Sequence, residues 1–136
     1  MKTIHPPETH SIQYPQGTIQ RAERAMRCAP FHLRLFATMR GQSVPIHAIA
    51  GKSGREKHYR RSPLTELAAE TELIWLIQVG LLRREVDGQG ITDSFRLTPL
   101  GRKIVEKWEN AGGEIPAPTL GDRLYNFLNR RLKLPV

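Results

Sequence analysis

Basic side chains gathered between residues 51 and 61 are the part of this sequence most able to do chemistry. The segment reads GKSGREKHYRR and carries five Lys or Arg residues against one glutamate. Clustered cations bind polyanions because phosphate contacts release condensed counterions, and an aromatic ring among them can stack on a base. The segment therefore predicts a nucleic-acid contact surface formed by Lys52, Arg55, Lys57, Arg60 and Arg61, with Tyr59 available for stacking.

Further cations lie earlier in the chain. Arg21, Arg24 and Arg27 recur every three residues along one side of an expected helix. The net charge is +8, and residues 18–62 alone hold ten Lys or Arg against two Glu, so the remainder is formally neutral. This distribution favours a surface that faces a polyanion. The alternative is a solvated basic face, which is common in small proteins.

No group of residues in the sequence is arranged for catalysis, metal binding or cofactor binding. The GKSG run at residues 51–54 has Ile46 where a Walker loop needs a glycine, and no apolar helix follows it as in a KH domain. The histidines lack partners at metal-ligand spacing, and His32 is expected at the edge of the core. Cys28 is expected to be a small buried side chain rather than a redox sensor activated by Arg27. We therefore expect no enzyme, no metal and no cofactor.

Length and composition indicate a single domain in the cytoplasm. The 136 residues are 39% apolar, which suffices for one modest core. No run approaches the roughly 18 apolar residues of a membrane span, and the first residues lack the apolar region of a signal peptide. One cysteine allows no internal disulfide and suits a reducing compartment.

The elements that must position these residues are mainly helical. Proline, glycine and capping residues divide the chain at regular intervals. The expected order is a helix over 18–29, a helix over 31–40, an extended piece at 42–45, a short helical piece at 46–50, a basic loop at 51–61, a helix over 63–79 capped by Ser62, two strands at 81–86 and 91–98, and a helix over 99–110. The predicted domains are a flexible arm (1–17), a central domain (18–111), a linker (112–118) and an amphipathic C-terminal helix (119–136).

The two strands are expected to form a hairpin around Gly88 and Gln89. A regular register would place Leu82 opposite Phe95, Val86 opposite Ile91 and Arg84 opposite Asp93. The first two pairs would build an apolar face and the third a cross-strand ion pair. Arg83 and Arg96 would then lie on the outer face as secondary phosphate contacts.

The run GLLRREVDGQGITDSFRLTPLGRKIVEKW (residues 80–108) resembles the wing and following helix of MarR- and PadR-type regulators. The whole chain is also similar to small winged-helix proteins of cyanobacteria. The resemblance implies a mainly α fold with a small β-hairpin wing, that is, a winged helix-turn-helix with extra N- and C-terminal helices. It also implies DNA binding through the helix over 63–79. That helix departs from the pattern, because it carries Glu66, Glu70 and Glu72 and no Lys or Arg.

Two functions therefore stay open. The first is a transcription-regulator-like protein that binds nucleic acid, DNA in preference to RNA, mainly through phosphate electrostatics. The second is a non-enzymatic adaptor that binds a protein through the face of Glu66, Glu70 and Glu72. Glutamates exposed and isolated from the basic loop would favour the adaptor. The C-terminal helix bears an apolar stripe that either pairs with a second copy or folds back on the core, formed by Leu120, Leu124, Phe127 and Leu128.

Overall fold

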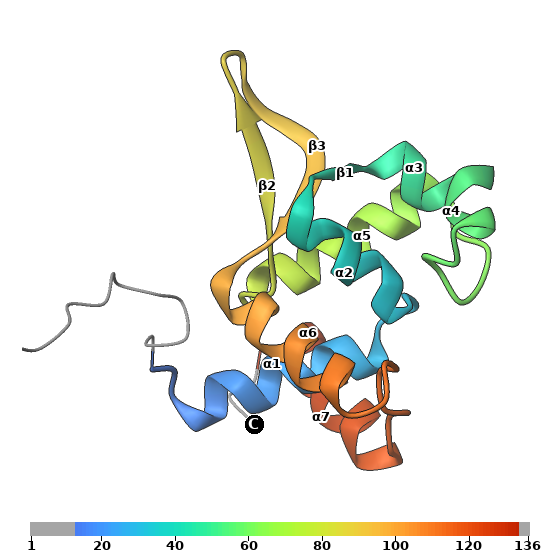
Figure 1. Cartoon of the computed structure of the whole chain (residues 1–136). Coiled ribbons are helices and arrows are strands. Elements are labelled where there is room, and N and C mark those ends of the chain that lie inside the picture. Colours follow the sequence, from blue (N-terminus) through green and yellow to red (C-terminus); the bar gives the residue numbers. More distant parts are fainter. Residues whose placement is uncertain (1–12, 134–136) are drawn as a thin grey trace, which may run out of the picture.

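Helices and strands follow one another largely in the predicted order. A computed structural model describes residues 13–133 (Figure 1). Its elements are α1 (Gln16–Cys28), α2 (Leu33–Gly41), β1 (Val44–Pro45), α3 (Ile46–Ala50), α4 (Lys52–Glu56), α5 (Glu66–Gln78), β2 (Leu82–Asp87), β3 (Gly90–Leu97), α6 (Pro99–Asn110) and α7 (Leu120–Arg131). Up to residue 12, the predicted arm lies outside the described residues, and Gln16 and Gly17 open α1.

The strands form one small antiparallel sheet in the order β1-β3-β2. Val44 in β1 pairs with Phe95 in β3, and the β2–β3 hairpin projects beyond the helices (Figure 1). The helix–strand–helix–helix–hairpin order of α2, β1, α3, α5 and β2–β3 confirms the predicted fold class. The chain is mainly α with a small three-stranded antiparallel sheet that carries a β-hairpin wing, and α1 and α7 are helices at its two ends.

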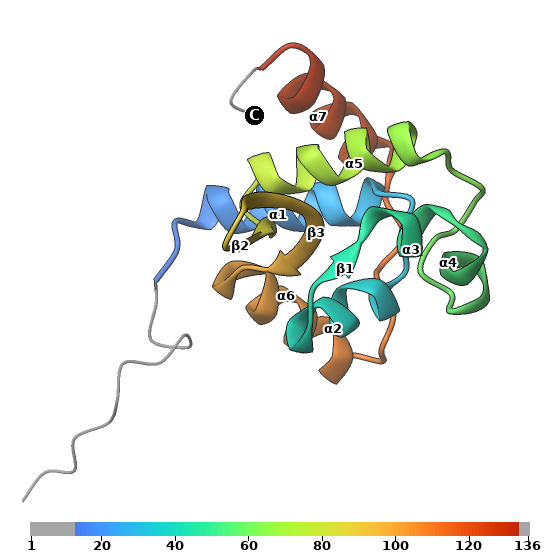
Figure 2. The ribbon, with the colours of Figure 1, turned by 90° about the horizontal axis from the view of Figure 1, so that it is seen from above.

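One hydrophobic core joins α1 to the other elements. Ala22, Ala25 and Met26 lie on one face of α1 and are fully buried. They belong to the same cluster of buried side chains as Leu73 of α5 and Ile104 of α6. The spacing of three and four residues gives α1 a continuous apolar face, so it packs as part of the domain. Figure 2 shows α1 running beneath α5, with α7 on the outer side of α5.

Helix starts with a capping side chain are found where the sequence predicted them, with one exception. Thr98 accepts a hydrogen bond from the Gly101 amide at the start of α6. Thr119 and Asp122 form a capping box at the start of α7. The predicted start of α5 at Ser62 is wrong, because Thr65 provides the cap and the helix begins at Glu66.

The hairpin register is correct near the turn and wrong near the base. Val86 pairs with Ile91 as predicted, but the register shifts between Arg84 and Val86. Arg84 consequently lies opposite Phe95 and Leu82 opposite Leu97. The extra residues of this irregularity turn Arg84 toward the ring of Phe95, at 4.9 Å from its centroid, instead of toward Asp93.

The predicted basic loop at 51–61 is partly helical, because a close backbone contact fixes α4 against α3. A Cβ atom at Gly54 would lie 2.0 Å from the carbonyl oxygen of Ile49, and one at Gly51 would lie 2.7 Å from that of His47. Both glycines of the GKSG run therefore allow two backbone segments to approach closely. This packing, rather than phosphate binding, explains the GKSG spacing.

Candidate nucleic-acid interface

Helix α4 presents a group of free cations. The side chains of Lys52, Arg55 and Lys57 are exposed and form no ion pair with any described residue. Lys52 and Arg55 lie in α4, and Lys57 is the residue that ends this helix. We call these three residues the α4 cations. Figures 1 and 2 place α4 beyond the N-terminal end of α5, while the hairpin begins at the C-terminal end of α5.

The wing adds one more free cation. Arg83 and Arg96 face each other across β2 and β3, on the same side of the hairpin as predicted. Arg83 is exposed and has no ion pair with the part of the chain that the structure describes. Arg96 lies 3.6 Å from Glu85, and its Nε is buried without a partner. Arg83 is therefore the better placed of the two for a phosphate.

Three other residues of the basic segment, Tyr59, Arg60 and Arg61, make contacts that fix the position of the segment. Tyr59 is only 4% exposed, so the prediction that it stacks on bases is wrong. Arg60 donates from Nη1 to the carbonyl of Ser62 and from Nη2 to that of Gly51, each at 3.2 Å. Arg61 donates from Nε to the carbonyl of Phe31 at 3.1 Å. These bonds fix the chain between α4 and α5 and leave the α4 cations as its outward charges.

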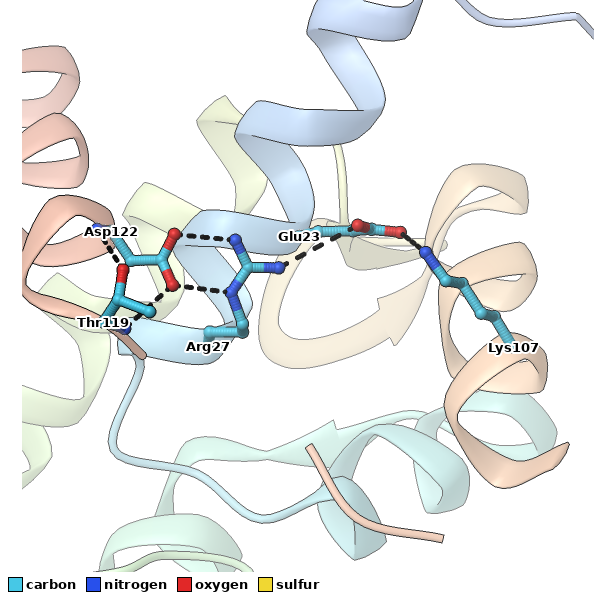
Figure 3. A network of polar contacts seen from close by, with 5 residues as sticks. All are labelled: Glu23, Arg27, Lys107, Thr119 and Asp122. Carbon is cyan, nitrogen blue, oxygen red and sulfur yellow. Dashed lines mark hydrogen bonds and ion pairs between the residues drawn. The ribbon is translucent and has the colours of Figure 1, made fainter. Parts of the chain in front are cut away.

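Two of the three arginines of α1 attach α7 instead of facing solvent. Arg27 donates to both carboxylate oxygens of Asp122, at 3.0 Å and 2.9 Å, and lies 3.9 Å from Glu23 (Figure 3). Arg24 donates to Asn129 at 2.8 Å and lies over the ring of Tyr125. Their assignment to phosphate is wrong, since each is already engaged within the chain. Arg21, one turn earlier, lines a cavity beside Asn129 and has a buried Nε without a partner.

Figure 3 shows how this network spans three helices. Lys107 of α6 lies 2.8 Å from Glu23 of α1, and Arg27 of α1 continues the contact to Asp122 of α7. The Arg27 guanidinium, helped by the backbone amide of Thr119, lowers the pKa of Asp122 from 3.8 to about 2. The ionised form of this carboxylate is therefore the one that holds α7.

Two of the three glutamates of α5 are paired, but neither is paired with the basic segment. Arg84 of the wing donates to Glu70 at 3.2 Å, and Arg130 of α7 donates to Glu72 at 2.9 Å. Glu66 is exposed and has no ion pair within residues 13–133. The sequence did not identify Arg84 and Arg130 as partners, because both lie far along the chain from the glutamates. Two carboxylates are thus neutralised and one stays free.

The outward face of α5 is apolar where a DNA-reading helix carries cations. Leu67 is 74% exposed and Ile74 is 38% exposed, one above the other at a spacing of seven residues. Thr71 lies between them, and its hydroxyl is bonded to the carbonyl of Leu67. This face offers contact area and few hydrogen-bond donors.

Helix α7 packs with its polar side inward. Trp75 of α5 donates from Nε1 to Asn126 at 2.9 Å, and its side chain is 8% exposed. The apolar stripe points outward. Leu120, Leu124 and Phe127 are exposed, and Leu128 is half-buried. The stripe does not fold back on the core, so pairing with a second copy stays a prediction.

Cys28 and the potential metal ligands of residues 13–133 are the remaining groups that could do chemistry. Burial raises the pKa of Cys28, Asp122 raises it further, and nearby arginines oppose the shift. A thiol with a raised pKa is a weak nucleophile. Among residues 13–133, no three His, Cys, Asp or Glu side chains gather as metal ligands. In the same range, each helix is too short or too polar to cross a bilayer.

The fold and this surface define a class: a mainly α chain with a small β-hairpin wing and free cations beside its central helix. The chain belongs to the Npun_F0494-like family, whose model matches residues 12–130. Comparison with curated proteins gives no match, and comparison with solved structures gives none either. The resemblance to MarR- and PadR-type regulators stays a prediction.

Proposed function

We propose that this protein binds nucleic acid through phosphate contacts, as a transcription-regulator-like protein of the cytoplasm. The observation that carries the proposal is the set of free α4 cations at one end of α5, with Arg83 on the wing that begins at the other end. Cations on both sides of a helix can contact the phosphates of the two nucleic-acid strands that border a groove. Most other cations of the basic segment are held within the chain, so Lys52, Arg55, Lys57 and Arg83 are the proposed contacts.

The charges on α5 are compatible with an approach to phosphates. Arg84 and Arg130 neutralise Glu70 and Glu72, so the repulsion is limited largely to Glu66. Because α5 carries no Lys or Arg, sequence readout by bidentate contacts to guanine is not expected. The proposed binding is therefore mainly electrostatic. Duplex DNA is the favoured target, since its wide major groove admits a helix and the deep groove of A-form RNA does not.

The first prediction concerns the salt dependence of DNA binding. Changing Lys52, Arg55 and Lys57 together to alanine is expected to reduce the slope of log K against log salt concentration by about 3, because each phosphate contact contributes about 0.9. Fluorescence anisotropy of a labelled duplex, titrated at several salt concentrations, measures both slopes. Single-stranded RNA serves as the competing target.

A matched control separates phosphate contacts from net charge. Arg123, Arg131 and Lys133 are exposed cations at the other end of the chain, and changing all three to glutamine removes the same charge. This variant is expected to retain nearly the full slope. Equal losses in both variants would show that total charge, not the α4 surface, drives binding, and no binding at low salt would refute the proposed function.

A protein-binding adaptor is the second candidate, and the outward face of α5 favours it. Exposed Leu67 and Ile74 beside unpaired Glu66 would suit a partner with apolar and basic side chains better than a phosphate backbone. The basic segment forms no ion pair with Glu66, Glu70 or Glu72, but only Glu66 is exposed, so the expectation that would favour the adaptor is met in part.

The second prediction separates the two candidates. If α5 faces a duplex, Glu66→Lys removes one repulsion and adds one attraction, so DNA affinity at low salt is expected to rise about tenfold. Glu106→Lys, an equal change at an exposed position of α6, is expected to have a much smaller effect. Both affinities come from the anisotropy assay above. Equal effects of the two changes would place α5 away from the duplex and favour the adaptor.

A further inference from the structure

A cavity of about 430 Å³, which none of the α4 cations lines, lies on the side of the molecule where α2 begins. Three segments that are distant in the sequence meet there: the start of α2, the turn after α4, and the segment between α6 and α7 (Figures 1 and 2). Its volume is within the range of small-molecule pockets. The lining is formed by His32, Leu33, Arg34, His58, Arg61, Gly113, Glu114, Ile115 and Ala117.

The lining concentrates positive charge. Arg34 and Arg61 face one carboxylate, that of Glu114, so the charge is +1 with both imidazoles neutral and +3 with both protonated. Burial lowers the pKa of His32, Arg61 and His58 lower it further, and Glu114 opposes the shift. Arg61 and His58 are therefore close enough to His32 to disfavour its protonated form, and Glu114 does not compensate them fully.

Backbone hydrogen bonds hold this group of cations in place. The amide of His32 donates to the carbonyl of Tyr59 at 2.9 Å, and the amide of Arg61 donates to that of Pro30 at 2.9 Å. His58 has a φ of 58°, in the left-handed region that side chains other than glycine seldom adopt. The backbone thus positions His32 and Arg61 beside each other, and no ion pair among residues 13–133 involves Arg34 or Arg61.

The start of α2 adds two further donors. His32 precedes this nine-residue helix, and its side chain does not cap it. The amides of Leu33 and Arg34, both in the cavity lining, form no backbone hydrogen bond within residues 13–133. First-turn amides carry partial positive charge and bind anions. The sequence placed His32 at the edge of the core, whereas the structure exposes it at this opening.

We propose that this cavity binds a small phosphate monoester. The planar guanidinium of Arg34 matches the geometry of a phosphate, Arg61 adds the Nη atoms that its Nε bond to the carbonyl of Phe31 does not use, and the α2 amides and imidazoles supply additional donors. Leu33, Ile115 and Ala117 line the rest of the space, which leaves room for the organic part of the ligand. The site goes beyond the proposed nucleic-acid function, because none of the α4 cations lines it.

The test is a titration of the full-length chain, followed by ¹H–¹⁵N NMR, with inorganic phosphate, ribose 5-phosphate and ribose at constant ionic strength. Saturable binding of ribose 5-phosphate is expected to shift the amides of His32, Leu33 and Arg34 and to raise the pKa of His32, since the bound anion favours imidazolium. Ribose alone is expected to cause no shift. Ribose 5-phosphate is expected to bind more tightly than inorganic phosphate.

Two variants and one control make the test specific. Arg34→Gln and His58→Gly are each expected to weaken binding of ribose 5-phosphate at least fivefold, and glycine at position 58 suits the positive φ, so that chain retains its fold. Lys52→Gln removes an equal charge outside the cavity and is expected to leave the affinity unchanged. Equal losses in all three, or an affinity for ribose 5-phosphate no greater than for inorganic phosphate, would overturn the proposal.

The same variants distinguish this site from the nucleic-acid surface. Lys52→Gln is expected to lower duplex affinity and spare ribose 5-phosphate binding, whereas Arg34→Gln is expected to do the reverse. If the unsubstituted protein did not bind a duplex, the proposed nucleic-acid function would be refuted, whereas the proposal of a phosphate monoester site would be unaffected.

Discussion

Gly54→Ala is expected to lower the free energy of unfolding by about 3 kcal/mol, the largest effect of any single change considered for this chain. The added Cβ would lie 2.0 Å from the carbonyl oxygen of Ile49, 2.6 Å from its carbonyl carbon and 2.8 Å from the carbonyl oxygen of Ala48. All three contacts are with backbone, which has no rotamer that relieves the clash. Helix α4 must therefore move away from α3, and the core beneath loses contacts. Urea unfolding followed by circular dichroism measures the change.

Gly17→Ala is the matched control for this substitution. No atom lies within 4 Å of the Cβ that alanine would add at Gly17, which belongs to the first turn of α1. Alanine has a better helix propensity than glycine, so this variant is expected to gain up to about 0.5 kcal/mol. An unfolding midpoint for Gly54→Ala that matches the parent would show that α3 and α4 are not in such close contact.

Asp122→Asn is expected to release α7 from the body of the protein. The change removes the charge that binds Arg27 in two hydrogen bonds and weakens the capping box with Thr119. The expected loss of docking free energy is about 2 kcal/mol, consistent with the depressed pKa of Asp122. Release of α7 uncovers Trp75, so its fluorescence is expected to shift to longer wavelength and to become more sensitive to acrylamide.

The same contact predicts how docking depends on pH. The pKa of Asp122 is about 2 in the folded protein, below its ordinary value of 3.8. A carboxyl whose folded-state pKa is depressed stabilises the folded form above its ordinary pKa, and this contribution is lost as protons bind. Docking of α7 is therefore expected to weaken as the pH falls from about 4 to about 2, and Asp122→Asn is expected to abolish this part of the pH dependence.

Glu109→Gln is the control for the release of α7. Glu109 accepts two hydrogen bonds from Arg40, at 2.6 Å and 3.0 Å, so this arginine–carboxylate pair is also bidentate, but it joins α2 to α6. Each side chain is about one-third exposed, and such pairs contribute less than about 1 kcal/mol. Trp75 is expected to stay covered in this variant. Equal spectral shifts in the two variants would indicate general destabilisation instead of release of α7.

Local signals in the sequence were sufficient to predict the capped helices and the turn of the hairpin. Thr98 and Thr119 each precede a helix whose first-turn amides they cap, and these contacts involve residues only three positions apart. The pairing of Val86 with Ile91 follows in the same way from a two-residue turn. A prediction based on neighbours in sequence succeeds where the stabilising contact is itself local.

Contacts between distant residues explain what the sequence could not predict. The row of arginines on α1 has the spacing of a phosphate-binding surface, but Arg27 meets a partner 95 residues away and Arg24 one 105 residues away. Helix α4 has only five residues, too few to be stable alone, and it forms because Gly54 allows it to pack on α3. In both cases, contacts between parts of the chain that are distant in sequence determine the structure.

The base of the wing has a consequence for any duplex that binds there. The Thr98 amide donates to the carbonyl of Leu81, and a Cβ at Gly101 would lie 2.5 Å from that same oxygen. Strand β2 is therefore clamped to α6 at its first residues and has little freedom to pivot. Because this fixes the position of Arg83 relative to α6, a duplex whose groove did not match the span between Arg83 and the α4 cations would have to bend or narrow its groove to reach both. Flexible pyrimidine–purine steps would then be preferred over stiff A-tracts, a selection by DNA bendability that requires no contact with a base.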